Sequence, residues 1–101
     1  VIGNAQVTDI YTGKTFIGNI DIAPTLERIQ NGIKDTHKHD GFIFRNDGTG
    51  MLLPEKPLAY YKEYVHRTPG IDGVGPQRVI IGNGGEIYYT PDHYKSFIKI
   101  Q

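Results

Sequence analysis

The sequence contains no cysteine, no excess of either charge and no long apolar run. Without cysteine there is neither a disulfide framework nor a thiolate metal site. Lys plus Arg and Asp plus Glu number 11 each, so any attraction to nucleic acid must come from a local patch of the surface. No signal-peptide pattern or membrane-spanning run is visible, and we expect no membrane partner.

The length of 101 residues is enough for one small domain, so we expect a single domain over 1–101. Hydrophobic residues make up 38% of the chain, which is sufficient for a folded core. The chain starts at Val1 and not at Met, from which we expect a processed or excised piece of a longer polypeptide.

One helix is expected in the first part of the chain. Residues 1–22 read as irregular or weakly β, with a turn at 12–14. The helix is expected over 23–33, because Pro24 suits a first helical position and Gly32 marks an end. Its apolar face consists of Leu26, Ile29 and Ile33.

Short β-branched and aromatic runs in the rest of the chain predict the strands of one sheet. These runs are 42–44, 59–67, 78–81, 86–89 and 95–100. Alternation within 59–67 places Tyr61, Glu63, Val65 and Arg67 on one face, and Tyr60, Lys62, Tyr64 and His66 on the other. The pattern is typical of an α+β fold, with the N-terminal helix packed on a twisted antiparallel sheet of four to five strands over 42–101.

Three side chains able to handle phosphate lie on successive elements of this predicted sheet: Glu63, Arg78 and His93. Because neighbouring strands usually pair, we expect the three to converge on one face. Arginine is a fixed cation, and histidine is an acid near neutral pH. Spacing alone leaves a second interpretation open, in which Glu63 and Arg78 form an ordinary ion pair and His93 caps a turn.

The polar segment 35–41 holds two histidines and two aspartates. One interpretation is a metal nuclease centred on His37, His39 and Asp40. No distant His or Cys completes a ligand shell, however, so we favour a solvated loop or a substrate contact and expect neither a metal nor a cofactor.

Five sequence blocks occur in the order of a known enzyme family. They are Phe44-Arg45-Asn46, Tyr60-Tyr61-Lys62-Glu63-Tyr64, Thr68-Pro69-Gly70, Arg78-Val79-Ile80 and Tyr89-Thr90-Pro91-Asp92-His93-Tyr94. In these blocks the chain resembles the microbial guanyl-specific ribonucleases of the barnase and Streptomyces type, from about Phe42 to Ile100. The most specific piece is DHYKSF at 92–97. The sequence is also similar to ribonuclease domains at the C-termini of bacterial polymorphic and contact-dependent toxins.

The resemblance implies that Glu63 is the general base, that His93 is the general acid and that Arg78 holds the phosphate. It implies a metal-independent endoribonuclease that cleaves single-stranded RNA after guanosine and leaves a 2′,3′-cyclic phosphate. DNA has no 2′-hydroxyl and is not expected to be cut.

The resemblance also assigns supporting residues. His37, Arg67 and Tyr94 are expected to contact phosphate or substrate, although Tyr94 is equally compatible with a half-buried aromatic of the sheet. Arg45, Asn46 and Asp47 are expected to bind the base. The family carries a second arginine near the position of Val74. We expect either that Lys62, His66 or Arg67 supplies its charge or that the cleavage rate is lower.

The similarity to toxin domains implies a biological setting. We expect an antibacterial toxin domain, monomeric when free, that is secreted or delivered from a bacterial cell as part of a larger protein. It would act in the target-cell cytoplasm and be held in check by a cognate immunity protein. The alternative is a degenerate domain of the same fold that binds RNA or protein without cleaving.

Overall fold

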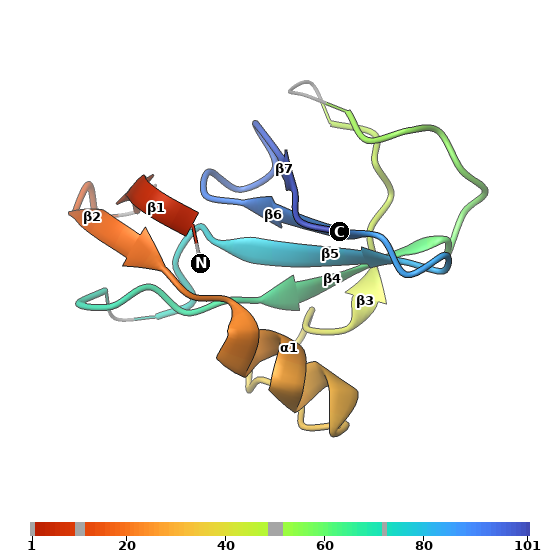
Figure 1. Ribbon diagram of the computed structural model, residues 1–101, viewed down its shortest axis with the longest axis horizontal. Helices are drawn as coiled ribbons and strands as arrows, with labels where there is room; N and C mark the ends of the chain where they lie inside the picture. The colour runs from red at the N-terminus through yellow and green to blue at the C-terminus, as the bar shows by residue number, and fades with distance from the viewer. Residues whose placement is uncertain (1, 10–11, 49–51, 72) are drawn as a thin grey trace.

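The computed structural model describes residues 2–9, 12–48, 52–71 and 73–101. Its elements in chain order are β1 (Ile2–Thr8), β2 (Thr15–Ile20), α1 (Ala23–Gln30), β3 (Phe42–Ile43), β4 (Tyr61–Val65), β5 (Arg78–Gly82), β6 (Ile87–Thr90) and β7 (Ile98–Lys99). β1 and β2 form an antiparallel hairpin, and the other strands form a five-stranded antiparallel sheet in the order β3-β4-β5-β6-β7 (Figure 1). The expected α+β fold, with one helix against an antiparallel sheet, is confirmed.

The first 22 residues are more regular than the sequence predicts. β1 and β2 pair with Thr8 opposite Thr15, and Gly13 adopts a φ of 74° in the turn between them. Asp9 closes this turn, because its carboxylate accepts a bond from the Thr12 hydroxyl at 2.7 Å. Residues 10 and 11, which directly precede the expected turn at 12–14, lie outside the described residues.

α1 ends at residue 30 and not at residue 33. Gly32 adopts a φ of 73°, a left-handed conformation that turns the chain out of the helix. The N–H groups of Gly32 and Ile33 donate to the carbonyls of Ile29 and Arg28, at 3.1 and 2.8 Å. Ile33 therefore leaves the predicted apolar face and is 59% exposed. Among the described residues, no helix has the length and apolarity needed to cross a membrane.

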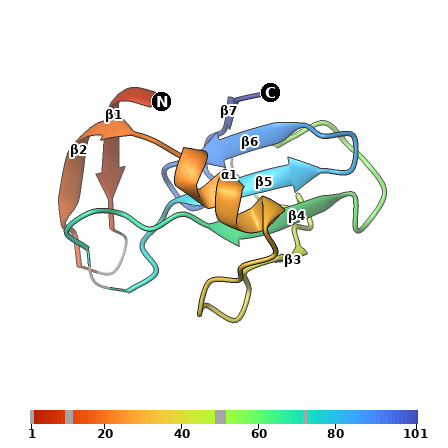
Figure 2. The ribbon, with the colours of Figure 1, turned by 60° about the horizontal axis from the view of Figure 1, so that its bottom comes forward.

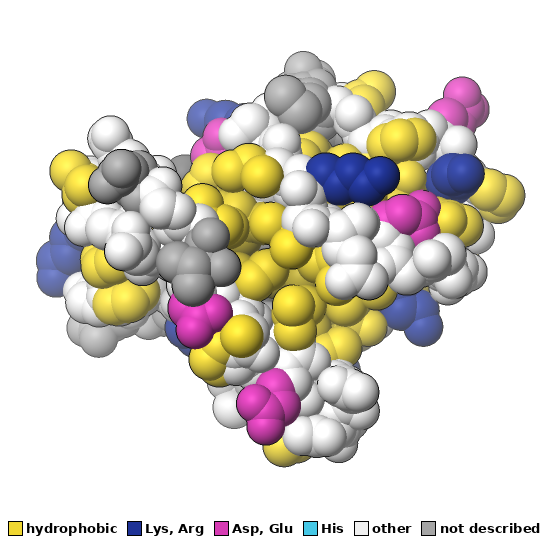
Figure 3. Space-filling view, viewed as in Figure 1, with side chains coloured by type: hydrophobic (Ala, Val, Ile, Leu, Met, Phe, Trp, Pro, Cys, Tyr) yellow, Lys and Arg dark blue, Asp and Glu magenta, His cyan; other side chains and the backbone are white. Residues whose placement is uncertain are grey.

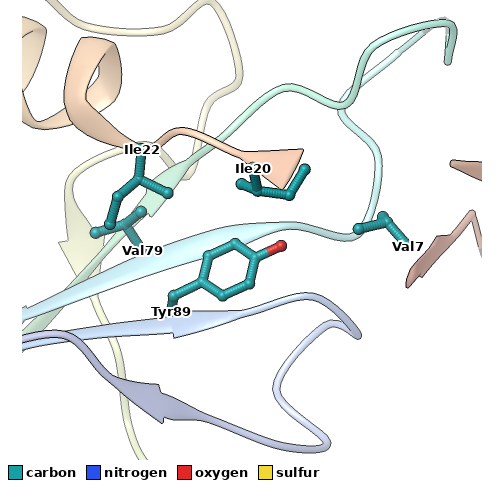
Figure 4. Close-up of a cluster of buried hydrophobic side chains, with 5 residues drawn as sticks. All are labelled: Val7, Ile20, Ile22, Val79 and Tyr89. Carbon is teal, nitrogen blue, oxygen red and sulfur yellow. The ribbon is translucent and has the colours of Figure 1, made fainter. Parts of the chain in front are cut away.

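The five-stranded sheet carries a hydrophobic cluster on each face. Figure 4 shows the first cluster, in which Val79 and Tyr89 of the sheet meet Val7, Ile20 and Ile22 from the N-terminal segment. Figures 1 and 2 show the hairpin and α1 on this side, and Figure 3 shows hydrophobic side chains gathered between them. The second cluster contains Leu53, Tyr61, Ile80 and Tyr88. The side chains of β4 thus alternate as predicted, with Tyr61 in the second cluster and Tyr64 against the first.

Asp40 ties α1, the 35–41 segment and the sheet together. Its carboxylate is buried and accepts bonds from Arg28 at 2.8 and 3.0 Å. It also accepts the backbone N–H groups of Val65 and Asp35, at 2.8 and 3.0 Å. Burial raises the pKa of Asp40, but these hydrogen bonds and the Arg28 charge outweigh burial and leave the pKa below its ordinary value. Asp40 therefore stays ionised and anchors the segment that carries His37 and His39.

Candidate active site

Glu63 lies in the middle of β4, on the sheet face that carries the second cluster. Its register partners are Phe42 on β3 and Ile80 on β5. Burial raises the pKa of the Glu63 carboxyl. A hydrogen bond from the Tyr94 hydroxyl and the positive charges of Arg78 and His39 act in the opposite direction but do not cancel that rise. A carboxylate with a raised pKa is a stronger proton acceptor, which suits a general base.

Arg78 is the first residue of β5 and lies on the same face as Glu63. Its register partners are Val65 on β4 and Thr90 on β6, and Glu63 precedes Val65 by two positions. The Arg78 side chain is buried, and its Nη1 donates to the carbonyls of Gly75 and Gln77 at 2.8 and 2.7 Å. These two bonds fix the guanidinium and use only the hydrogens of Nη1, so the hydrogens of Nε and Nη2 are not consumed by them.

His93 and Tyr94 form a left-handed turn directly after β6. Their φ angles are 54° and 76°, a conformation that costs about 1–2 kcal/mol per non-glycine residue. The turn is held because the His93 N–H donates to the Pro76 carbonyl and the Tyr94 N–H donates to the Thr90 hydroxyl, both at 3.0 Å. The two rings lie against each other with centroids 4.7 Å apart. Strained backbone of this kind gathers at functional sites.

The electrostatic environment of His93 joins it to the rest of the site. Burial lowers the pKa of the imidazole, and electrostatic repulsion from Arg78, and from His37 whenever that ring is protonated, lowers it further. Arg78 therefore acts on both Glu63 and His93, as expected for a cation placed between them. An anion bound beside Arg78 would oppose these charges, so we expect a phosphate to raise the pKa of His93 again.

His37 is half-buried beside these groups, and its hydrogen bonds define its tautomer. The His39 N–H donates to His37 Nδ1 at 3.2 Å, so we assign the ring hydrogen to Nε2. Burial is the main cause that lowers the pKa of His37. Repulsion from Arg78, His39 and Arg67 lowers this pKa further, and Asp35 opposes the shift. His37 is consequently a neutral N–H donor. The lone pair on Nδ1 already accepts the His39 N–H, which makes His37 a poor proton acceptor.

Arg67 is engaged outside the site. Its Nε and Nη2 donate to the Asp35 carboxylate at 3.1 and 2.7 Å. Asp35 in turn accepts the His37 N–H at 2.9 Å. Arg67 thus holds the segment that positions His37, and its contact with the substrate stays a prediction.

The other two candidates for the missing second arginine also lie elsewhere. Lys62 pairs with Ile43 and points to the face opposite Glu63. His66 is 9% exposed, and its Nδ1 is 2.7 Å from the Thr25 hydroxyl on α1. The expectation that either residue supplies the charge missing at Val74 is therefore wrong, because strand alternation and the contact with the helix turn both side chains away.

The metal interpretation of the 35–41 segment does not fit this structure. Both Asp40 oxygens are occupied by Arg28 and backbone N–H groups. Within 2–9, 12–48, 52–71 and 73–101, no three His, Cys, Asp or Glu side chains gather so as to hold a metal ion.

A cleft of about 270 Å³ opens beside Glu63. It is lined by Ile43, Phe44, Arg45, Asp47, Gly48, Leu52, Glu63 and Tyr94. Two of the three predicted base-binding residues thus line one cleft, which we call the base cleft, together with the candidate general base. The Asn46 side-chain amide donates to the Leu53 carbonyl and accepts the Leu53 N–H, both at 2.9 Å, and its contact with the base stays a prediction. Asn46 therefore shapes the loop.

The position of Tyr94 is compatible with both predictions from the sequence, a substrate contact and a half-buried aromatic of the sheet. Its ring packs in the second cluster, 4.8 Å from the Phe44 ring, as a half-buried sheet aromatic does. Its hydroxyl faces Glu63 and Arg78. Burial raises the pKa of the Tyr94 hydroxyl and the charge of Glu63 adds to this, so the hydroxyl remains a neutral donor.

Two residues beside the site are absent from the predicted set. His39 enters the sequence argument only as a metal ligand, yet its charge lowers the pKa of Glu63. Phe42 faces Glu63 directly across the β3–β4 ladder. The positions of both residues follow from the register of β3 against β4. A strand of two residues is too short for its sequence to predict that register.

Comparisons with known proteins show which family the whole chain resembles. The sequence model of a family described as ribonuclease matches residues 5–101. Guanyl-specific ribonuclease St from Saccharopolyspora erythraea is 42% identical over 74 residues, which are 72% of this chain and 70% of that protein. Guanyl-specific ribonuclease Sa from Kitasatospora aureofaciens is 38% identical over 77 residues, 75% of this chain and 78% of that protein. The structure of ribonuclease Sa2 in complexes with mononucleotides matches with a TM-score of 0.69 at 37% identity, covering 77% of this chain and 79% of that one.

Proposed function

Because this chain belongs to the family of microbial guanyl-specific ribonucleases, we propose that it cleaves single-stranded RNA after guanosine and leaves a 2′,3′-cyclic phosphate. The activity is that of a guanyl-preferring endoribonuclease. The observation that carries the mechanism is the placement of a carboxylate, a guanidinium and an imidazole across neighbouring strands. Glu63 lies on β4, Arg78 begins β5 and His93 follows β6.

This order of side chains matches the chemistry of an internal nucleophile. Glu63 takes the proton of the ribose 2′-hydroxyl, and the 2′-oxygen forms a bond to phosphorus. The bond from phosphorus to the 5′-oxygen breaks, and His93 gives its proton to that leaving oxygen. Arg78 lies between base and acid, where its Nε and Nη2 hydrogens can bind the phosphate and stabilise the charge of the transition state.

The supporting residues take separate tasks in this proposal. His37 donates its Nε2 hydrogen to a phosphate oxygen and remains neutral. Arg45 and Asp47 line the base cleft. The Asp47 carboxylate is able to accept hydrogen bonds from N1 and the exocyclic amine of guanine. Tyr94 keeps its hydroxyl hydrogen and orients the Glu63 carboxylate.

The test is cleavage of a single-stranded RNA with one guanosine in excess chelator. We expect full activity and, by mass spectrometry, a cyclic phosphate at the 3′ end of the upstream fragment, because no step uses a metal. A matched oligonucleotide with 2′-deoxyguanosine at that position is expected to remain intact. Inhibition by the chelator, or cleavage of the deoxy substrate, would reject the mechanism.

The same assay addresses a second function. Val74 in place of an arginine, with no other cation supplying its charge, favours a degenerate domain that binds RNA without cutting it. Such a domain would bind the RNA and leave it intact in both the presence and the absence of chelator.

We further propose that the activity serves an antibacterial toxin domain, delivered as part of a larger protein into a target-cell cytoplasm and neutralised by an immunity protein. A ribonuclease with no demand beyond accessible guanosine damages any cell that contains it. Because Arg78 is a permanent cation and His93 carries a proton when it acts as the acid, the inhibitor is expected to be acidic where it covers them.

We expect synthesis of the wild-type chain in a bacterial cytoplasm to arrest growth. A chain carrying both Glu63→Gln and His93→Asn is expected to be tolerated at the same level, because it lacks both proton-transfer groups. The readout is growth rate against protein level for the two chains. Normal growth with a soluble wild-type chain that cleaves RNA after purification would contradict the toxin role.

A further inference from the structure

A second cleft, of about 580 Å³, lies along the outer strand β3. Its lining includes the apolar side chains of Phe42, Ile43 and Leu58 and the cations Arg45 and Lys62. Ile43 and Arg45 also line the base cleft. The two clefts therefore adjoin, and a chain that leaves the base cleft meets the second cleft without crossing solvent.

The apolar side chains of this second cleft are unusually open to solvent. Phe42 is 49% exposed, Ile43 is 45% exposed and Leu58 is 68% exposed. Phe42 lies directly opposite Glu63 in the β3–β4 ladder, so its side chain stands on the catalytic face. An exposed aromatic ring beside a general base provides a surface on which a nucleobase can stack.

Cations surround this ring on a protein with no net charge. Lys34 Nζ is 5.5 Å from the centroid of the Phe42 ring, and the His39 ring is 5.1 Å away. Lys34, Arg45 and Lys62 form a local positive patch here, and the described lining of the second cleft contains no carboxylate. Such a patch fits a polyanion with aromatic bases better than an acidic or purely apolar ligand.

The contact between Lys34 and Phe42 does not prevent stacking. An exposed cation–π contact changes affinity by only about 2- to 5-fold. Stacking of a base on an aromatic ring is worth about 5- to 150-fold. A base therefore displaces the ammonium, which is then free to pair with a phosphate.

We propose that the second cleft is a subsite for the nucleotide on the 5′ side of the cleaved guanosine. Phe42 stacks on its base, and Lys34 and Arg45 pair with its phosphate. The proposal rests on the proposed function, because His93 defines the direction of the RNA. His93 protonates the leaving 5′-oxygen beyond β6, so the downstream chain departs there, and the upstream chain lies toward β3 at the other edge of the sheet.

The test compares kcat/KM for the trinucleotide UpGpU with kcat/KM for the dinucleotide GpU. In the wild type we expect the added 5′ uridine to raise kcat/KM by about 5-fold or more. Phe42→Leu keeps an apolar side chain without a π face and is expected to bring the ratio near 1. Phe42→Tyr restores stacking and is expected to restore the ratio. Ile17→Ala, which changes a 71% exposed residue on β2, is the matched control and keeps the wild-type ratio.

Binding separates this proposal from the proposed function. UpGpU with 2′-deoxyguanosine is not cleavable, and its Kd is measured by calorimetry for the same variants. Failure to cleave GpU rejects the proposed function, while a Kd that rises in Phe42→Leu and recovers in Phe42→Tyr still supports the subsite. If neither the Kd nor the ratio of the two kcat/KM values depends on Phe42, the subsite proposal is overturned. A dependence seen only with GpUpU overturns the assignment to the 5′ side.

Discussion

Replacement of His93 by asparagine is expected to lower kcat/KM on GpU by about a hundredfold to ten-thousandfold, the usual contribution of a general acid. Asparagine has no proton to give at neutral pH, but it tolerates the left-handed backbone with a φ of 54° at this position. The residue is open to solvent overall and its ring is only partly covered, with Tyr94 beside it, so little packing is lost. Steady-state cleavage and thermal unfolding, measured together, separate lost chemistry from lost structure.

The dependence of kcat/KM on pH tests the same role of His93. His93 acts as an acid only while protonated, so kcat/KM of the wild type is expected to fall as pH rises through the pKa of His93 in the free protein. That pKa lies below its ordinary value of 6.5, chiefly because of burial and the charge of Arg78. The asparagine variant is expected to lack this alkaline limb, whereas Lys95→Ala, at an exposed neighbouring residue, keeps it. Near-normal turnover in His93→Asn would remove His93 from the mechanism.

The sheet and the convergence of the three main residues were predictable from sequence, since both follow from short-range rules. Strands that follow one another in the chain usually pair, here even across residues 66–77 between β4 and β5, and alternation assigns the faces. These rules place Glu63 and Arg78 on one face once their strands are adjacent. The sequence does not fix where a strand ends, and Arg67 lies two residues beyond the last residue of β4. Strand alternation therefore does not fix the face on which the Arg67 side chain lies, and this side chain binds Asp35.

The segment 35–41 was the least predictable part of the site. Its conformation depends on long-range partners of Asp35 and Asp40, namely Arg67 and Arg28. No local pattern in the sequence reveals these ion pairs. The neutral tautomer of His37 likewise depends on one backbone hydrogen bond from His39. Sequence reasoning can name such residues as candidates, but their roles follow from the fold.

Replacement of Glu63 by glutamine is expected to lower kcat/KM on GpU by about a hundredfold to ten-thousandfold at the pH optimum and to abolish the acid limb of the pH profile. A base acts only when deprotonated, so wild-type activity falls as pH drops through the pKa of Glu63. Burial raises that pKa above its ordinary value of 4.5, while the pKa of His93 is lowered from 6.5. The two limbs thus approach each other, and the profile of kcat/KM is expected to be a narrow bell.

Two further measurements test whether Glu63 is the general base: the stability of Glu63→Gln and the activity of His37→Ala. Because the pKa of Glu63 is raised in the folded state, its ionised form opposes folding, and that cost is present once pH exceeds the folded pKa. Glutamine removes the cost, so urea unfolding at neutral pH is expected to show no loss of stability. His37→Ala is expected to cost less activity than Glu63→Gln and to retain the acid limb, because His37 supplies only a neutral N–H group. If His37→Ala instead removes the acid limb and costs as much as Glu63→Gln, the general base is His37.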